Sequence, residues 1–137
     1  MTLPPLPRQL NKREANWTTN FFKGWLLKNP LPTGPIEVKQ TTKDYLAFSA
    51  VAEHQLAALI ACTTAQGFWW KVADMGARNA FDIVWYCNSA AWVVIKYPKG
   101  FVVIDARVFK AEKQKSPRKS LTWERACLLQ TSVWGLP

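Results

Sequence analysis

The sequence predicts a single α/β domain in which a mixed sheet of about five strands is flanked by helices. Two observations predict this class. Apolar residues recur at helical spacing in some segments and alternate with polar residues in others, so both helices and strands are expected. The chain has 137 residues, of which 49% are hydrophobic and 20% charged, and this composition is typical of one packed domain rather than of a disordered chain.

The N-terminal part is expected to contain an arm, a helix and a strand. Residues 1–11 contain three prolines and are expected to form an extended arm, followed by one domain over residues 12–137. Large apolar residues at helical spacing predict an amphipathic helix over 12–28, which ends at a proline-rich turn. Residues 35–41 alternate apolar and polar side chains, and this pattern predicts a short strand with one buried face.

A second helix and several strands are expected to follow. Ser49 is a candidate N-cap for this helix, and Gly67 is a candidate C-terminal glycine. Four runs rich in aromatic and β-branched residues predict strands, at 68–73, 81–86, 92–97 and 101–105. Residues 87–90 are expected to form a hairpin turn between two of these strands, and Ser120 to cap a closing helix that ends near residue 131.

The eight tryptophans are expected to divide between core and surface. Five of them fall in apolar periodic segments and are expected in the core: Trp17, Trp25, Trp69, Trp85 and Trp92. Trp123 and Trp134 are expected to be freer, and to stack on bases or on a second subunit.

The charge balance indicates a polyanionic partner. Eighteen Lys and Arg residues stand against nine Asp and Glu, which gives a formal net charge of +9 and makes nucleic acid the first candidate. A basic segment near the C-terminus supplies the candidate DNA-binding residues Lys110, Lys113, Lys115, Arg118 and Lys119. Binding through such residues should weaken steeply with salt, because each neutralised phosphate releases counterions.

Cysteine usage and the N-terminal sequence indicate where the protein works. The three cysteines lie far apart without metal-site or disulfide-type spacing, which favours a reducing cytoplasm. The first residues lack the apolar stretch of a signal peptide, and no run of about 18 apolar residues occurs. We therefore expect a cytoplasmic protein without a membrane partner.

The first predicted strand carries the sharpest candidate for chemistry, Glu37-Val38-Lys39. Side chains two apart on a strand share a face, so the carboxylate and the ammonium are expected about 7 Å apart along the chain. Such a pair can hold a hard divalent cation and orient a water molecule for hydrolysis. The alternative is an ordinary solvated strand face.

Glu14 is a second candidate acid. It shares a face of the first predicted helix with Trp17, Phe21 and Trp25, so its carboxylate needs a partner. It is either a second oxygen ligand for the cation at Glu37 or a first-turn acid favoured by the helix dipole.

Several short motifs occur in one order over about residues 12–126. They are Ile36-Glu37-Val38-Lys39-Gln40-Thr41, Leu46-Ala47-Phe48-Ser49, Glu53-His54-Gln55-Leu56, Gly67 and Arg118-Lys119-Ser120-Leu121. In this order they resemble the PD-(D/E)xK nuclease superfamily, and more narrowly the RecU-type Holliday junction resolvases and their compact phage relatives.

The resemblance implies a restriction-endonuclease-like core and Mg²⁺-dependent hydrolysis of phosphodiester bonds, with Mn²⁺ as a substitute. It further implies a homodimer that acts on branched DNA, in the bacterial host cytoplasm for a phage protein. By the same resemblance Glu37 is a metal ligand, Lys39 the catalytic lysine and Glu14 the helix-borne acid. Gln55 would hold a water molecule or a phosphate oxygen, whereas His54 alone at a helix start is more typical of packing or capping.

The chain departs from the superfamily pattern at one position. The superfamily places an Asp on the strand before the E-x-K motif, but residues 30–35 of this chain are proline-rich and carry no carboxylate. Asp82 is the first candidate to fill the metal site, and Asp74 is a weaker one. The alternative for Asp82 is a turn or cap acid that accepts hydrogen bonds from nearby backbone.

Three functions follow from these observations. The leading hypothesis is a Mg²⁺-dependent, structure-selective DNA endonuclease of the Holliday junction resolvase kind. The missing Asp motivates a second hypothesis, a non-catalytic protein that binds junctions or DNA on the same fold. A third hypothesis is an RNA-binding or RNA-processing protein.

Overall fold

A computed structural model describes residues 10–29, 31–72 and 80–130, and describes side chains of the first helix from residue 16 onward. The expected arm, Asp74, Trp134 and the Glu14 side chain lie outside this description. The described helices are α1 (Leu10–Phe21), α2 (Glu53–Cys62), α3 (Ala106–Lys115) and α4 (Trp123–Leu129), with a π-helical turn at Phe22–Leu26 and a 3₁₀ turn at Phe48–Ala50. The described strands are β1 (Ile36–Gln40), β2 (Tyr45–Ala47), β3 (Phe68–Lys71), β4 (Ile83–Tyr86), β5 (Trp92–Tyr97), β6 (Gly100–Asp105) and β7 (Ser120–Thr122).

The central sheet is mixed and has the strand order β1-β5-β6. β1 runs parallel to β5, with Val38 opposite Val94, and β5 runs antiparallel to β6. The chain leaves β1, forms α2 and returns along β5, and parallel neighbours require such a crossover connection. The α/β class predicted from the sequence is therefore confirmed.

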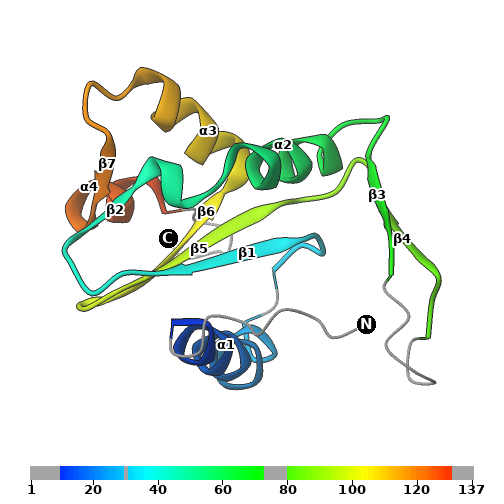
Figure 1. Cartoon of the computed structure of the whole chain (residues 1–137), viewed down its shortest axis with the longest axis horizontal. Helices are drawn as coiled ribbons and strands as arrows, with labels where there is room; N and C mark the ends of the chain where they lie inside the picture. Colours follow the sequence, from blue (N-terminus) through cyan, green and yellow to red (C-terminus); the bar gives the residue numbers. More distant parts are fainter. Residues whose placement is uncertain (1–9, 30, 73–79, 131–137) are drawn as a thin grey trace, which may run out of the picture.

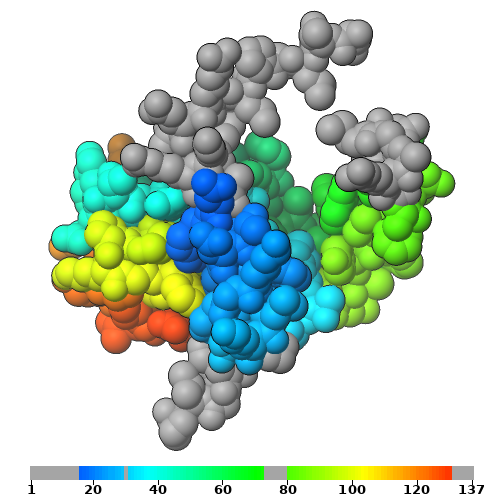
Figure 2. Space-filling model, turned by 90° about the horizontal axis from the view of Figure 1, so that it is seen from below, coloured from blue at the N-terminus to red at the C-terminus, as the bar shows by residue number. Residues whose placement is uncertain are grey.

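Helices cover both faces of this sheet (Figure 1). On one face, α2 and α3 pack against Val93 and Ile95, and Phe109 of α3 is fully buried there. On the other face, α1 packs its aromatic side chains against Val38 and Val94. Figure 2 shows α1, in blue, lying in front of the sheet on this second face.

The sheet is smaller than expected, because the predicted strands do not all join it. β3 and β4 pair antiparallel with each other and form a separate hairpin, which extends away from α2 (Figure 1). β2 and β7 form another two-stranded pair, which places Leu46 opposite Leu121 in the core. Over the described residues the largest sheet has three strands, so the expectation of about five strands in one sheet is wrong.

The chain between β4 and β5 explains why the hairpin stays apart. Residues 87–90 were expected to turn β4 back onto β5, but the backbone N–H of Asn88 donates to the Thr64 carbonyl at 2.8 Å, and that of Ser89 to the Cys62 carbonyl at 3.0 Å. This segment is thereby tied to the end of α2. Among the described residues, the strands that pair antiparallel with their next neighbour in the chain are β3 with β4 and β5 with β6.

Two tryptophans expected in the core are exposed because of this hairpin. Trp69 and Trp85 lie opposite each other across β3 and β4 and are 62% and 61% exposed. Trp92 is buried as expected, whereas Trp123 packs edge-on against Tyr97 at 5.4 Å between ring centroids instead of remaining free.

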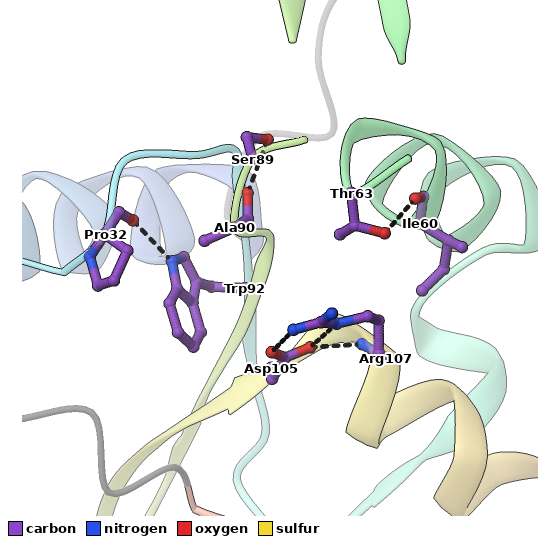
Figure 3. A network of polar contacts seen from close by, with 8 residues as sticks. All are labelled: Pro32, Ile60, Thr63, Ser89, Ala90, Trp92, Asp105 and Arg107. Carbon is purple, nitrogen blue, oxygen red and sulfur yellow. Dashed lines mark hydrogen bonds and ion pairs between the residues drawn. The ribbon is translucent and has the colours of Figure 1, made fainter. Parts of the chain in front are cut away.

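The helix boundaries also differ from expectation. α2 begins at Glu53 with Ala52 as its N-cap, so Ser49 does not cap it, and it ends at Cys62, well before Gly67. The Thr122 side chain, rather than Ser120, accepts a hydrogen bond at the start of α4. The basic segment after β6 begins as a helix, α3, whose N-cap is Asp105 (Figure 3). No helix in the described ranges is long and apolar enough to cross a bilayer.

Residues 31–35, before β1, form hydrogen bonds to the start of β5 and do not form a strand. The Trp92 indole N–H donates to the Pro32 carbonyl at 3.1 Å (Figure 3), and the Trp92 backbone N–H donates to the Pro35 carbonyl at 3.0 Å. A side chain at Gly34 would place its Cβ 1.7 Å from the Ala90 carbonyl oxygen, so only glycine fits this approach. Residues 31–35 are thus described without a strand.

Replacing Tyr97 by Phe should destabilise the fold. Tyr97 is fully buried, and its hydroxyl donates to the Leu121 carbonyl at 3.0 Å, which joins β5 to β7. Without the hydroxyl, the Leu121 carbonyl loses this hydrogen bond in the protein interior, and the unfolding free energy should fall by about 1–3 kcal/mol. Tyr45, which is 44% exposed, offers the matched control, because Tyr45→Phe should change stability by less than about 0.5 kcal/mol. Urea denaturation measures both, and equal effects would contradict the assigned role of the Tyr97 hydroxyl.

Candidate functional site

Glu37, Lys39 and Gln55 form a polar cluster between β1 and α2. Val38 points into the α1 core, so its neighbours Glu37 and Lys39 point to the opposite face, which α2 covers. The Lys39 Nζ and the Gln55 Nε2 both contact the Glu37 Oε1, each at 3.1 Å. The side chains of Lys39 and Glu37 are only 18% and 26% exposed. The structure thus brings together three residues that the sequence singled out.

The Gln55 amide is held in one orientation by two contacts. Its Oε1 accepts a hydrogen bond from the Ala52 backbone N–H at 3.1 Å, which satisfies a free donor at the start of α2. Its Nε2 consequently faces Glu37, to which it donates. Gln55 therefore couples the start of α2 to the carboxylate on β1, and its nitrogen is the atom directed at the cluster.

An apolar cleft of about 390 Å³ opens beside the cluster. Its walls come from the beginning of β1, one face of α2 and one face of β3. Glu37, His54 and Gln55 supply its polar side, and Phe68 and Trp70 supply aromatic surface. Apolar walls with a few convergent polar groups are typical of ligand sites.

The cluster fits part of a divalent-cation site. Both donors to Glu37 fall on its Oε1. Mg²⁺ is commonly held by one or two carboxylates together with water and substrate phosphate, and Glu37 can supply one such ligand. The described side chains contain no group of three or more His, Cys, Asp and Glu residues that could enclose a metal ion.

The other candidate acids lie elsewhere or outside the description. Asp82 is exposed near the tip of the hairpin, where its backbone carbonyl accepts from the Val72 N–H at 2.9 Å, and it does not line the cleft. Glu14 lies on α1, which covers the face of the sheet opposite Glu37, and its side chain is not described. Asp74 is outside the described ranges.

The basic residues lie along α3 and the loop after it. Lys113 forms an ion pair with Glu53 at 2.6 Å, and this contact joins α3 to the first turn of α2. Lys115 and Arg118 line a second cleft of about 430 Å³ beside Arg125. The Arg125 guanidinium in turn neutralises the buried Glu112, with Nε 2.9 Å from Oε2. Lys110 and Lys119 belong to the same stretch, and Lys119 is exposed.

The sequence did not identify Phe68 and Trp70 as cleft residues. Trp69 and Trp70 are consecutive, so on a strand their side chains must point to opposite faces. This alternation was the signal in the sequence that one of them lies on the inner face of the strand. The pairing of β3 with β4 and the position of the hairpin beside α2 decide which of the two tryptophans points toward the rest of the protein. Local sequence determines neither.

Lys113 should control the ionisation of Glu53. The hydrogen bond and the charge of Lys113 hold the pKa of the Glu53 carboxyl below its ordinary value, and Lys110 adds a weaker effect of the same sign. A depressed folded-state pKa means that the contact stabilises the fold above the ordinary carboxyl pKa, and that this contribution disappears as pH falls through the lowered value. Lys113→Met should therefore raise the Glu53 pKa, as followed by carboxyl ¹³C NMR.

The matched control is Lys110→Met, which removes a charge from the same helix but no hydrogen bond to Glu53. The Glu53 pKa should rise less in this variant than in Lys113→Met. An unchanged Glu53 titration in Lys113→Met would show that the ion pair does not form in solution.

Comparison with known proteins places the chain in no family. No family model matches the chain, and neither a curated protein nor a solved structure matches it. Any role for the site therefore rests on the geometry of Glu37, Lys39 and Gln55 and on the cleft beside them.

Proposed function

We propose that this protein is a Mg²⁺-dependent, structure-selective DNA endonuclease that cuts branched DNA in the manner of a Holliday junction resolvase. One observation carries the proposal. The motif resemblance assigns Glu37, Lys39 and Gln55 to a nuclease site, and Lys39 and Gln55 both lie 3.1 Å from the Glu37 Oε1. Glu37 and Gln55 also line a cleft. Glu37 and Gln55 are 18 positions apart in the sequence, so their contact depends on the fold and not on local sequence.

The cluster supplies several groups that phosphodiester hydrolysis can use. In that reaction a water oxygen attacks phosphorus and loses a proton to the solvent, the bond to the leaving oxygen breaks, and the leaving oxygen takes up a proton from the solvent. Lys39 would place a positive charge beside the phosphate as negative charge develops on its oxygens. Gln55 Nε2 would exchange its contact with Glu37 for a phosphate oxygen or a water molecule. Mg²⁺, when bound through Glu37, supplies Lewis acidity toward the phosphoryl oxygen.

The distribution of positive charge supports a DNA substrate. The net charge of +9 is large for 137 residues, and α3 carries Lys110 and Lys113 beside the first turn of α2. Phosphates bound along α3 would therefore lie next to the helix that supplies Gln55. Backbone contacts of this kind position DNA without reading its sequence, which suits recognition of branched shape. A homodimer would place two such sites on symmetric strands.

Two observations favour a non-catalytic alternative on the same fold. Residues 31–35 form no strand, and Glu37 is the single carboxylate that lines the cleft among the described residues. A protein with half of a metal site would bind junctions through its basic surface without cutting them. It would bind equally well with EDTA and with Mg²⁺.

Glu37→Gln should abolish cleavage while leaving binding intact. With a labelled four-way junction and Mg²⁺, the cleavage rate should fall on the order of 100-fold or more, since the carboxylate is lost but the side-chain shape is kept. Lys39→Met should have a similar effect. Junction affinity in EDTA should be unchanged or slightly tighter for Glu37→Gln, because the variant carries one negative charge fewer.

Glu124→Gln is the matched control, because Glu124 is an exposed acid on α4 and does not line the cleft. Its cleavage rate should equal that of the unaltered protein. Cleavage that persists in Glu37→Gln would overturn the assignment of this site. Tight binding by the unaltered protein with no cleavage under any divalent ion would establish the non-catalytic alternative.

A further inference from the structure

We propose that the cleft beside Glu37 receives one unpaired DNA base, stacked against Trp70, from the nucleotide next to the phosphate bound at Glu37 and Lys39. This inference rests on the proposed nuclease function, because it takes the location of the phosphate from it. It adds a substrate feature: DNA that can present an unstacked base at the cutting position binds better than fully paired DNA.

The first support is the position of the cleft. Glu37 belongs both to the polar cluster and to the cleft wall, so the two sites share a residue and are continuous. A phosphate held at the cluster therefore leaves the adjoining sugar and base at the mouth of the cleft. The volume of about 390 Å³ lies within the range of ordinary ligand pockets, roughly 300–1,000 Å³.

The second support is the chemistry of the walls. Trp70 stacks on Tyr86 with ring centroids 6.1 Å apart and lies 5.9 Å from Phe68, so its ring is braced by aromatic neighbours. It remains 38% exposed and lines the cleft. Ala58 and Leu59 of α2 add apolar lining to the cleft. Such a cleft suits a flat aromatic base, because base stacking on aromatic side chains is favourable for every base.

The third support is the polar side of the cleft. His54 lines the cleft and is exposed, and no described residue forms a hydrogen bond with its ring. Its ring nitrogens can donate to or accept from the edge of a base. The role expected for His54 from sequence, packing or capping, does not use these atoms, since the Gln55 side chain caps the helix.

Stacking on Trp70 requires the base to be unpaired. Both faces of a base within a duplex are covered by its stacked neighbours, so such a base offers no free face to Trp70. A base must leave its stack to enter such a side pocket, and this costs least where it is already mismatched or unpaired. Junction centres, bulges and single-stranded flaps offer bases of this kind, which fits a selectivity for branched DNA.

Two pairs of matched variants test the pocket. Trp69 and Trp70 are adjacent on β3, and only Trp70 lines the cleft. Ala57 and Ala58 are adjacent on α2, and only Ala58 lines the cleft, so Ala58→Leu fills it without altering the hairpin. Trp70→Ala and Ala58→Leu should lose the base site, whereas Trp69→Ala and Ala57→Leu should keep it. Trp70→Phe, which retains a flat ring, should keep most of it.

The measurement is the ratio of two dissociation constants in EDTA, for a fully paired duplex and for the same duplex with one bulged 2-aminopurine. The unaltered protein, Trp69→Ala and Ala57→Leu should prefer the bulged duplex on the order of tenfold, and the two cleft variants should bind both duplexes alike. The 2-aminopurine fluorescence should change on binding only where the preference is kept. Equal preference in all variants, or loss in Trp69→Ala as well, would overturn the base pocket.

Failure of this inference is distinguishable from failure of the nuclease proposal. A bulge preference that depends on Ala58 and Trp70, without any Mg²⁺-dependent cleavage, would support the pocket and reject the nuclease. Cleavage that depends on Glu37 and is as fast in Ala58→Leu as in Ala57→Leu, on bulged and paired DNA alike, would support the nuclease and reject the pocket.

Discussion

The candidate site depends on the alternation of side chains along β1. Val38 is buried against α1 on one face, and this fixes Glu37 and Lys39 on the other face, toward α2. A shift of one residue in the pairing with β5 would exchange the faces and place two charged groups in the α1 core. The same packing that forms the hydrophobic layer therefore determines where the charged pair lies.

Partly burying Glu37 and Lys39 costs desolvation free energy, and hydrogen bonds to the carboxylate offset this cost. Glu37 accepts from Lys39 and Gln55, and Gln55 is itself fixed by the backbone at the start of α2. A carboxylate held in this way would lose little further freedom on binding the proposed cation, and the Lys39 ammonium already lies 3.1 Å from it. Such an arrangement would be preorganised for the charged substrate that we propose.

The elements that local pattern determines were predicted well. The helix ending before the proline-rich turn, the strand with Glu37 and Lys39, and the strands now labelled β5 and β6 all follow from the period of apolar residues. The contact of Gln55 with Glu37 joins two elements and could not be predicted from periodicity. The shared face of Glu37 and Lys39 follows directly from their spacing.

The features that long-range pairing decides were missed. β3 and β4 have the composition of core strands, but they pair with each other beside α2, so Trp69 and Trp85 face outward and Trp70 faces the cleft. The helix cap was also missed. Ser49 was expected to cap α2, but the Gln55 side chain accepts a hydrogen bond from the Ala52 backbone N–H at the start of this helix. The surplus of positive charge was evident from composition, but its position beside the start of α2 required the contact between Lys113 and Glu53.

The most direct test of the Glu37 cluster as a divalent-cation site is a titration of ¹⁵N-labelled protein with Mn²⁺, observed by NMR. Paramagnetic broadening should be strongest for the amides of residues 36–39 and 53–56, and it should disappear from these residues in Glu37→Gln. Broadening centred on other acids, such as Asp44 or Glu124, or broadening at residues 36–39 that persists in Glu37→Gln, would contradict the site described for this protein.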